Sequence, residues 1–378
     1  MSFDEFTQYV KDNIKDFLPK EFADADVAIR EVVKNNDEKL CGLMIRRSED
    51  TIVPTIYLEE FYKNVNEGDK PLESVMTELA EIHQDHMANS FDINSITDFD
   101  KAKSNIRMKL INAEKNQENL KDKPHRIMDD LAVTYYVQIK NDEMGNASVA
   151  INEDMMKQYG LTEEGLHEIA SANMDLEAKP LFMDMNSMMR DIMKKSLPEG
   201  MPENIKDDLV DEALQNASAP GVYVLSNEEK YNGAAMLLSE KAMDMVRMNV
   251  GEDFFILPSS IHETIIVPKK DEFSLEDMEK MVREVNATQV SPDEQLSDHV
   301  YEYDAAERTI VRADKAEEKR LAKETEKAGP ETEKAVEKKN EGRVSFKEKL
   351  PEMKEKAAEQ AKLSVPQALG KKKETALA

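Results

Sequence analysis

Apolar residues near the N-terminus repeat with two different periods. Residues 3–17 carry them at helical spacing, with Ser2 and Glu5 placed as a capping box and Pro19 ending the helix. Two alternating runs, 27–33 and 40–46, flank a polar Asn-Asn-Asp sequence and predict a β-hairpin. Helices are expected next at 57–66 and from Pro71 onward. The first lobe, residues 1–92, is therefore predicted to be mixed α and β.

The same patterns continue after a connector at 93–103. Alternating or continuous apolar runs predict strands at 106–110, 131–139, 147–151, 221–225, 234–238, 254–257 and 261–267. Helical spacing predicts helices at 153–159, 163–173, from Pro202, up to Met248, and from Ser274. Hairpins followed by helices recur without a residue-level repeat. We therefore predict an α+β fold with a larger second lobe at 104–312.

From Ala313 onward the composition changes to Glu, Lys and Ala with almost no aromatic residues. Such a sequence buries too little apolar surface to offset the entropy of ordering. Residues 313–378 are therefore predicted to form a disordered, charged tail.

Charge limits the partners of this 378-residue chain, whose formal net charge is −27. The tail holds 17 basic and 14 acidic residues, which leaves −30 on residues 1–312. A surface of that sign repels phosphate backbones and anionic lipids, so we expect neither nucleic-acid nor membrane binding by this part. Cys41 is the only cysteine, and no apolar run reaches the roughly 20 residues of a membrane helix. A cytoplasmic location is expected.

Several segments together resemble a known family. They are the opening Phe3-x-x-Phe6, Pro54–Leu58, Tyr223–Asn227 followed by Gly233-Ala234-Ala235, and Ile256–Glu263. They are similar to a bacterial domain family of unknown function, number five-six-eight-eight, which is found mostly in anaerobic Gram-positive gut bacteria. The resemblance spans roughly residues 1–312 and implies no activity. The segment 343–350 also resembles tails of proteins encoded by mobile elements.

The catalytic candidates are Ser259, Ser260, His262 and Glu263, which contain the parts of a nucleophile–base–orienter set. Neighbours along an extended segment point to opposite faces, and no Gly-x-Ser-x-Gly elbow surrounds the serines. The sequence favours a structural turn, with His262 and Glu263 in the returning strand.

His83 and His86 stand three residues apart on a predicted helix, as metal ligands can. Without a His-Glu-x-x-His pattern the pair indicates a helix cap or surface pair, and no metal is expected. The sequence also lacks the glycine-rich loops that bind nucleotides, so no cofactor is expected.

Methionine is unusually frequent, with 23 in the chain and six between Met183 and Met201. Phe182, Met185, Met189 and Ile192 form one helical stripe, and Met188 lies beside it. Flexible thioethers suit either an irregular core or an adaptable protein-binding surface, and both readings stay open.

Two hypotheses for function follow. The first is a non-enzymatic cytoplasmic binding or accessory protein, encoded on a mobile element, whose acidic surface meets a basic protein partner. The alternative is a hydrolase of unrecognised type that uses Ser259 or Ser260 with His262. The sequence does not identify the partner, the substrate or the oligomeric state.

Overall fold

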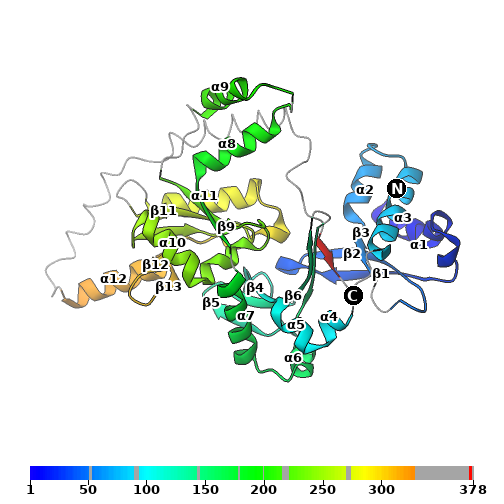
Figure 1. Cartoon of the computed structure of the whole chain (residues 1–378), viewed down its shortest axis with the longest axis horizontal. Coiled ribbons are helices and arrows are strands. Elements are labelled where there is room, and N and C mark those ends of the chain that lie inside the picture. Colours follow the sequence, from blue (N-terminus) through cyan, green and yellow to red (C-terminus); the bar gives the residue numbers. More distant parts are fainter. Residues whose placement is uncertain are drawn as a thin grey trace.

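The computed structural model describes residues 1–50, 53–88, 93–142, 145–177, 179–198, 200–214, 221–269, 274–327 and 374–376. Helices and three sheets make up these residues, so the predicted α+β class is confirmed (Figure 1). Within the described ranges, no helix combines the length and the apolar character that a membrane span requires.

The N-terminal lobe packs three helices on a small antiparallel sheet of order β1-β2-β3. Its elements are α1 (Phe3–Asn13), β1 (Asp26–Val33), β2 (Lys39–Arg46), β3 (Thr55–Tyr57), α2 (Glu59–Asn66) and α3 (Leu72–Ala88), with 3-10 turns η1 (Ile14–Phe17), η2 (Lys20–Phe22) and η3 (Asn35–Asp37). The predicted capping box of Ser2 and Glu5 begins α1. Phe6, Leu43 and Leu79 are fully buried in an apolar core drawn from this lobe alone.

Two sheets make up the second lobe. One contains β4 (Ile106–Asn112), β5 (His125–Met128), β6 (Leu131–Asp142), β7 (Gly145–Ala150) and β14 (Glu374–Ala376). The other has the order β13-β12-β10-β11-β9-β8 and contains β8 (Pro180–Asp184), β9 (Tyr223–Asn227), β10 (Phe254–Leu257), β11 (Thr264–Pro268), β12 (Tyr301–Asp304) and β13 (Thr309–Arg312). Its strand pairs are all antiparallel.

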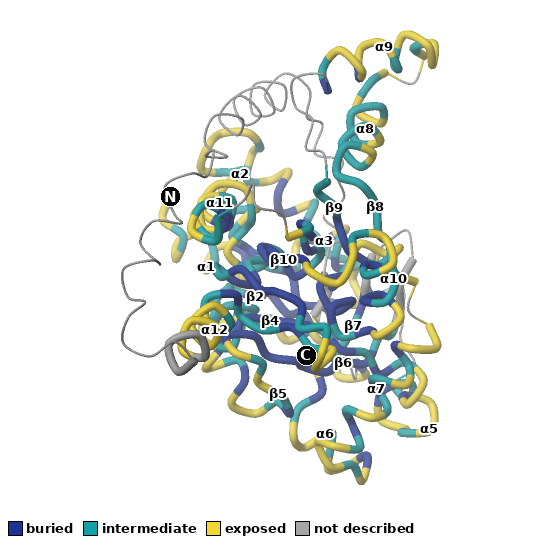
Figure 2. The backbone as a smooth tube through the Cα atoms, turned by 90° about the vertical axis from the view of Figure 1, so that its left-hand side faces the viewer, coloured by how far each residue is buried: buried dark blue, intermediate teal, exposed yellow. Residues whose placement is uncertain are grey.

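Both sheets contribute to one large apolar core, which includes Tyr135, Leu225 and Phe254. Besides α8, α9 and α12, which are described below, the helices of this lobe are α4 (Asn94–Thr97), α5 (Phe99–Ala102), α6 (Glu153–Gln158), α7 (Glu163–Glu177), α10 (Glu240–Val250) and α11 (Leu275–Thr288), with η4 (Lys103–Asn105), η5 (Gly233–Leu238) and η6 (Pro292–Glu294). In Figure 2 the tube is largely dark blue, and so buried, near the centre at β4, β6 and β10, whereas helices such as α6, α7 and α12 carry exposed yellow stretches at the outside.

Strand β10 shows why residues 254–257 form a continuous apolar run. Phe254 and Ile256 point into the large core, whereas Phe255 and Leu257 point to the other face of the sheet. There they pack with Met278 of α11 in a separate core. A strand covered on both faces has no polar face, so its sequence does not alternate.

A polar contact joins the two lobes at the β1–β2 turn. The backbone N–H of Asn36 donates to Asn116 Oδ1 at 2.8 Å, and Asn116 Nδ2 donates back to Asn36 Oδ1 at 2.9 Å. Asn36 Nδ2 also donates to the carbonyl oxygens of Pro292 and Gln295. The Asp37 carboxylate accepts the backbone N–H groups of Glu118 and Asn119. Asn36 and Asp37 both have positive φ, which Asn and Asp tolerate best among residues other than glycine.

Two predicted boundaries differ from the structure. The connector at 93–103 is helical, and Ala102 lies inside the large core, so its second half belongs to the second lobe. The first fifteen residues of the predicted tail form helix α12 (Ala313–Lys327), which begins directly after β13. Ala313 is buried, and Arg320 pairs with the buried Glu302 of β12. Of the tail after Lys327, only residues 374–376 are among the described residues.

The strand predicted at 234–238 is wrong, because these residues form the 3-10 helix η5. Asn232 has a left-handed φ of 51°, which turns the chain before η5 begins. Gly233 then lies against neighbouring backbone, where an added Cβ would be 2.4 Å from the carbonyl oxygen of His262. The apolar run is buried in the core as a helical turn, a conformation that periodicity alone does not distinguish from a strand in so short a run.

Candidate functional site

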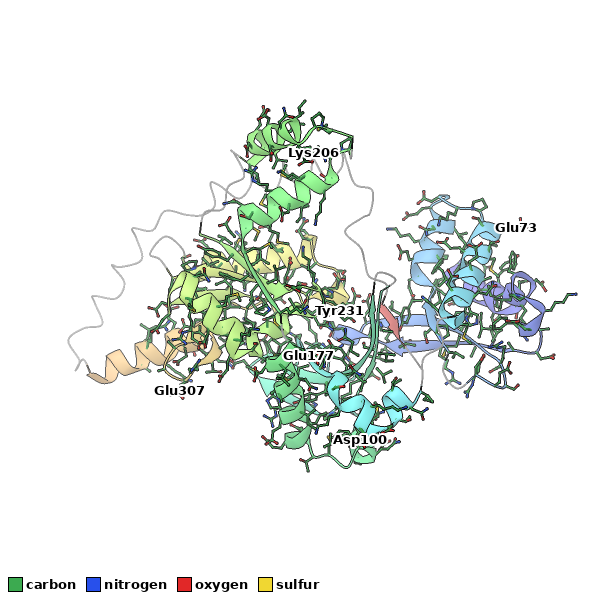
Figure 3. The ribbon with its side chains drawn as sticks, viewed as in Figure 1. Glu73, Asp100, Glu177, Lys206, Tyr231 and Glu307 are labelled. Carbon is green, nitrogen blue, oxygen red and sulfur yellow. The ribbon has the colours of Figure 1, made fainter. Side chains whose placement is uncertain are left out.

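The methionine-dense segment forms an edge strand followed by a projecting helical hairpin. Strand β8 is the last strand of its sheet, and α8 (Met185–Ser196) begins directly after it. Asp184 caps α8 by accepting the backbone N–H groups of Asn186 and Ser187. Helix α9 (Glu203–Leu214) lies beside α8, and both extend beyond the sheet (Figure 1). Lys206 in Figure 3 marks α9.

Ion pairs connect α8 to α9. Arg190 pairs with Asp211, and Lys194 pairs with Asp207. Arg190 and Lys194 follow Met185 by five and nine residues, and each residue turns the helix by about 100°. Both cations therefore lie on the side of α8 opposite Met185, and α9 covers that side.

The apolar stripe of α8 faces away from these ion pairs. Met185, Met188, Met189 and Ile192 have the spacing i, i+3, i+4, i+7 of one helix face. Each is only half-buried, and none belongs to the apolar cores that the described residues form. On α9, Ile205 and Leu209 are also 45% and 44% exposed. The hairpin thus presents apolar side chains outside the body of the protein.

Phe182 is separate from the methionine stripe. It lies on β8, where its ring stacks on Tyr223 of β9 with the centroids 5.1 Å apart. It packs against the edge of the large core. The five candidate binding residues are therefore divided between the sheet edge and the projecting helix.

The segment Pro258–Glu263 connects β10 to β11 as a six-residue loop. The prediction that His262 and Glu263 lie in the returning strand is wrong, because β11 begins at Thr264. The loop is held by backbone bonds to the 294–297 segment, from Leu296 N to Ser259 O at 3.1 Å and from Ile261 N to Glu294 O at 2.9 Å. These two bonds form an isolated antiparallel β-bridge between Ser260 and Gln295.

The ring nitrogens of His262 contact groups other than the serine hydroxyls. Its Nδ1 accepts the backbone N–H of Asn232 at 3.1 Å, and its Nε2 lies 3.6 Å from Glu294 Oε1. Tyr231, which Figure 3 labels, has its ring 5.6 Å from the imidazole. Ser260 Oγ accepts the backbone N–H of His262 at 3.0 Å, a local turn bond. Among the described residues, no hydrogen bond joins the imidazole to either serine hydroxyl, as a nucleophile–base pair requires.

Glu263 and Ser259 complete the loop. Burial raises the pKa of the Glu263 carboxyl, and His262 and Lys230 partly oppose this rise. Ser259 is buried, and its carbonyl accepts from Leu296. The contacts of Ser259, Ser260 and His262 hold the loop against the Asn232–Ala234 turn and the 294–297 segment.

His83 lies inside the N-terminal core rather than on the surface. Its side chain is 1% exposed, and its ring meets Phe22 edge-on at 5.2 Å. Neither ring nitrogen has a hydrogen-bond partner among the described residues. Burial lowers the pKa of His83 to about 4. The structure brings no third potential metal ligand to His83 and His86 within the ranges it describes.

A group of potential ligands that the sequence analysis missed lies on the second lobe. Glu279 of α11, His299 of the loop before β12 and Asp314 of α12 place their ligand atoms within 4.8 Å of one another. They come from three separate elements, so no spacing along the chain marks them.

Comparisons with known proteins place the chain in one family. No curated protein and no solved structure matches it. Residues 3–305 match the family described as DUF5688, family of unknown function. This range contains the N-terminal lobe, the second lobe as far as β12, the β8–α8–α9 segment and the Pro258–Glu263 loop. The chain therefore belongs to the DUF5688 family.

Proposed function

We propose that this protein is a non-enzymatic binding or accessory protein whose α8–α9 hairpin binds a basic, amphipathic helical segment of a partner protein. The observation that carries this proposal is the orientation of α8. Its methionine stripe faces away from α9 and lies outside the cores of the described residues.

Methionine suits such a surface physically. Its unbranched, polarizable side chain adapts to apolar partners of different shapes. Amphipathic helices bind apolar grooves through residues spaced like those of the α8 stripe itself. A helix that inserts Leu or Phe side chains between Met185, Met188 and Ile192 would remove apolar surface of both partners from water.

Charge supports a basic partner. The body carries a formal −30, and on α9 the exposed Asp208 and Glu212 stand next to Ile205 and Leu209. Carboxylates beside an apolar patch attract lysine and arginine on the polar face of a docking helix. They also repel an acidic helix with the same apolar face.

The setting that we propose is the bacterial cytoplasm. The single Cys41 and the acidic composition support it. The resemblance of residues 343–350 to tails of mobile-element proteins supports a gene carried by such an element in gut bacteria. That segment lies outside the described residues.

Two synthetic helical peptides test the proposal. Both carry the same leucine face, and one has lysine and the other glutamate on its polar face. We expect the lysine peptide to bind, and the Met188→Ser/Ile192→Ser variant to bind it at least tenfold more weakly. Met248→Ser is the control, because Met248 is 87% exposed on α10, outside the hairpin. Equal binding of both peptides, or unchanged binding by the double variant, contradicts the proposal.

A further inference from the structure

The second lobe brings an imidazole and two carboxylates together at the base of α12. Each of Glu279, His299 and Asp314 offers one potential ligand atom, and these three atoms all lie within 4.8 Å of one another. All three residues are half-buried, so water and small ions reach them while the backbone positions stay fixed by the fold. Three different elements supply the residues.

The fold fixes each residue independently. Glu279 lies on the α11 face next to Met278, which is buried in the small core. The backbone N–H of His299 donates to Ser297 Oγ at 3.0 Å. Asp314 follows the buried Ala313, whose N–H donates to the carbonyl oxygen of Val300 at 2.9 Å. The ligand positions are therefore determined by backbone contacts and do not depend on the side chains meeting one another.

The imidazole of His299 has an unsatisfied nitrogen. Its Nδ1 is shielded from solvent and has no hydrogen-bond partner among the described residues. A buried donor or acceptor left without a partner costs stability, so such atoms are rare in native proteins. A metal ion is one partner that such a nitrogen can take.

Each of the two carboxylates also pairs with one arginine. Arg312 donates to both oxygens of Asp314, and Arg283 lies 3.4 Å from Glu279 Oε2. Each carboxylate has about four lone-pair positions, so one arginine does not exhaust it. The hydrogen bond from Arg312 chiefly lowers the pKa of the Asp314 carboxyl.

We propose that Glu279, His299 and Asp314 form a binding site for a divalent transition-metal ion of the zinc class. One nitrogen and two oxygen ligands suit Zn²⁺, Mn²⁺ or Fe²⁺, whereas Mg²⁺ and Ca²⁺ prefer oxygen ligands alone. Three protein ligands leave room for water in the remaining positions. The ion joins α11, the loop before β12 and α12, so it fastens α12 to the second lobe.

Binding of Zn²⁺ to the full-length, chelator-treated protein tests the site. Titration calorimetry is expected to give one Zn²⁺ per chain, and bound Co²⁺ is expected to give visible absorption. His299→Ala, Glu279→Gln and Asp314→Asn each weaken Zn²⁺ binding at least tenfold. The last two keep the size of the side chain, and circular dichroism of the metal-free variants verifies that they fold.

Two controls make the result specific. His125→Ala removes a histidine of β5 whose Nδ1 bonds to the carbonyl oxygen of Lys123, and it leaves Zn²⁺ binding unchanged. A His83→Ala/His86→Ala variant tests the other histidine pair and also leaves binding unchanged. Zn²⁺ is expected to slow proteolysis within α12 in the wild type and not in His299→Ala. The proposal is overturned if no stoichiometric Zn²⁺ binds, or if binding survives the three ligand substitutions.

Discussion

Acidification should destabilise the N-terminal lobe through one residue, His83. The imidazole is enclosed by the core, with Phe22 against its edge and the Arg47–Asp50 ion pair nearby. Protonation would place a positive charge where neither nitrogen finds an acceptor. Burial therefore lowers the pKa of His83 to about 4; the nearby Asp50 carboxylate partly opposes this, and His86 and Arg47 add smaller lowering contributions.

The sign and size follow from linkage. An unfolded histidine has a pKa of about 6.5, so between pH 6.5 and pH 4 the unfolded chain takes up a proton that the folded chain does not. The free energy of unfolding falls as the pH falls through this window. A difference of about 2.5 pKa units corresponds to roughly 3 kcal/mol, fully lost below about pH 4. The side chain is almost completely enclosed, so screening by solvent does not reduce this figure much.

Urea unfolding at pH 7.0, 5.5 and 4.0 measures the effect. In the His83→Leu variant the loss between pH 7 and pH 4 should be smaller by roughly 3 kcal/mol. At pH 7 the variant should be at least as stable as the wild type, because it removes two unpartnered polar atoms. His125→Leu serves as the matched control and should keep the pH dependence of the wild type. The same acid loss in wild type and His83→Leu would refute this reasoning.

Three further outcomes are expected from thermal and urea unfolding. The Gly233→Ala substitution should lower the free energy of unfolding by about 1–3 kcal/mol, because the new Cβ would lie 2.2 Å from Ser226 Oγ. Gly200→Ala is its control and should leave the free energy of unfolding unchanged, because no atom lies within 4 Å of the new Cβ. Ser260→Ala should cost about 1 kcal/mol through the lost bond to His262 N and leave the fold intact, and an unaltered stability would contradict this. In a chain that ends at Arg312, the thermal transition of the second lobe should have a midpoint at least about 2 °C lower than in the full chain, and an unchanged midpoint of that transition would show that α12 does not stabilise the second lobe.

Local patterns predicted the elements whose periodicity is unambiguous. The capping box at Ser2, the hairpin with its turn at residues 35–37 and the helix after Ser274 occur as expected. In each of them the neighbouring residues along the chain contain the whole signal. Strands β12 and β13 were missed, because Tyr301–Asp304 mixes aromatic and acidic residues and its burial depends on β10 and α12.

The candidate site was harder to predict because burial and proximity depend on the tertiary fold. The sequence places His83 near the end of a helix, but in the fold Phe22, which lies 61 positions earlier, packs against its ring. Likewise, the Glu279–His299–Asp314 group forms only when α12 folds back along β12. The methionine stripe of α8 was visible in the sequence, but its position outside the cores follows from β8 being an edge strand. Edge position is a property of sheet order, which spacing along one segment does not encode.

The polar contact between the two lobes at Asn36 has a consequence for how the whole chain unfolds. The bonds between Asn36, Asn116 and the 292–295 carbonyls are hydrogen bonds between short amide and backbone groups, and each lobe keeps an apolar core of its own. Separating the lobes therefore returns amides to water and exposes little of either core, at a small cost per bond. Cooperativity between lobes depends on shared apolar surface, so the two lobes are expected to unfold in separate transitions rather than as one unit. A single midpoint would then describe neither lobe.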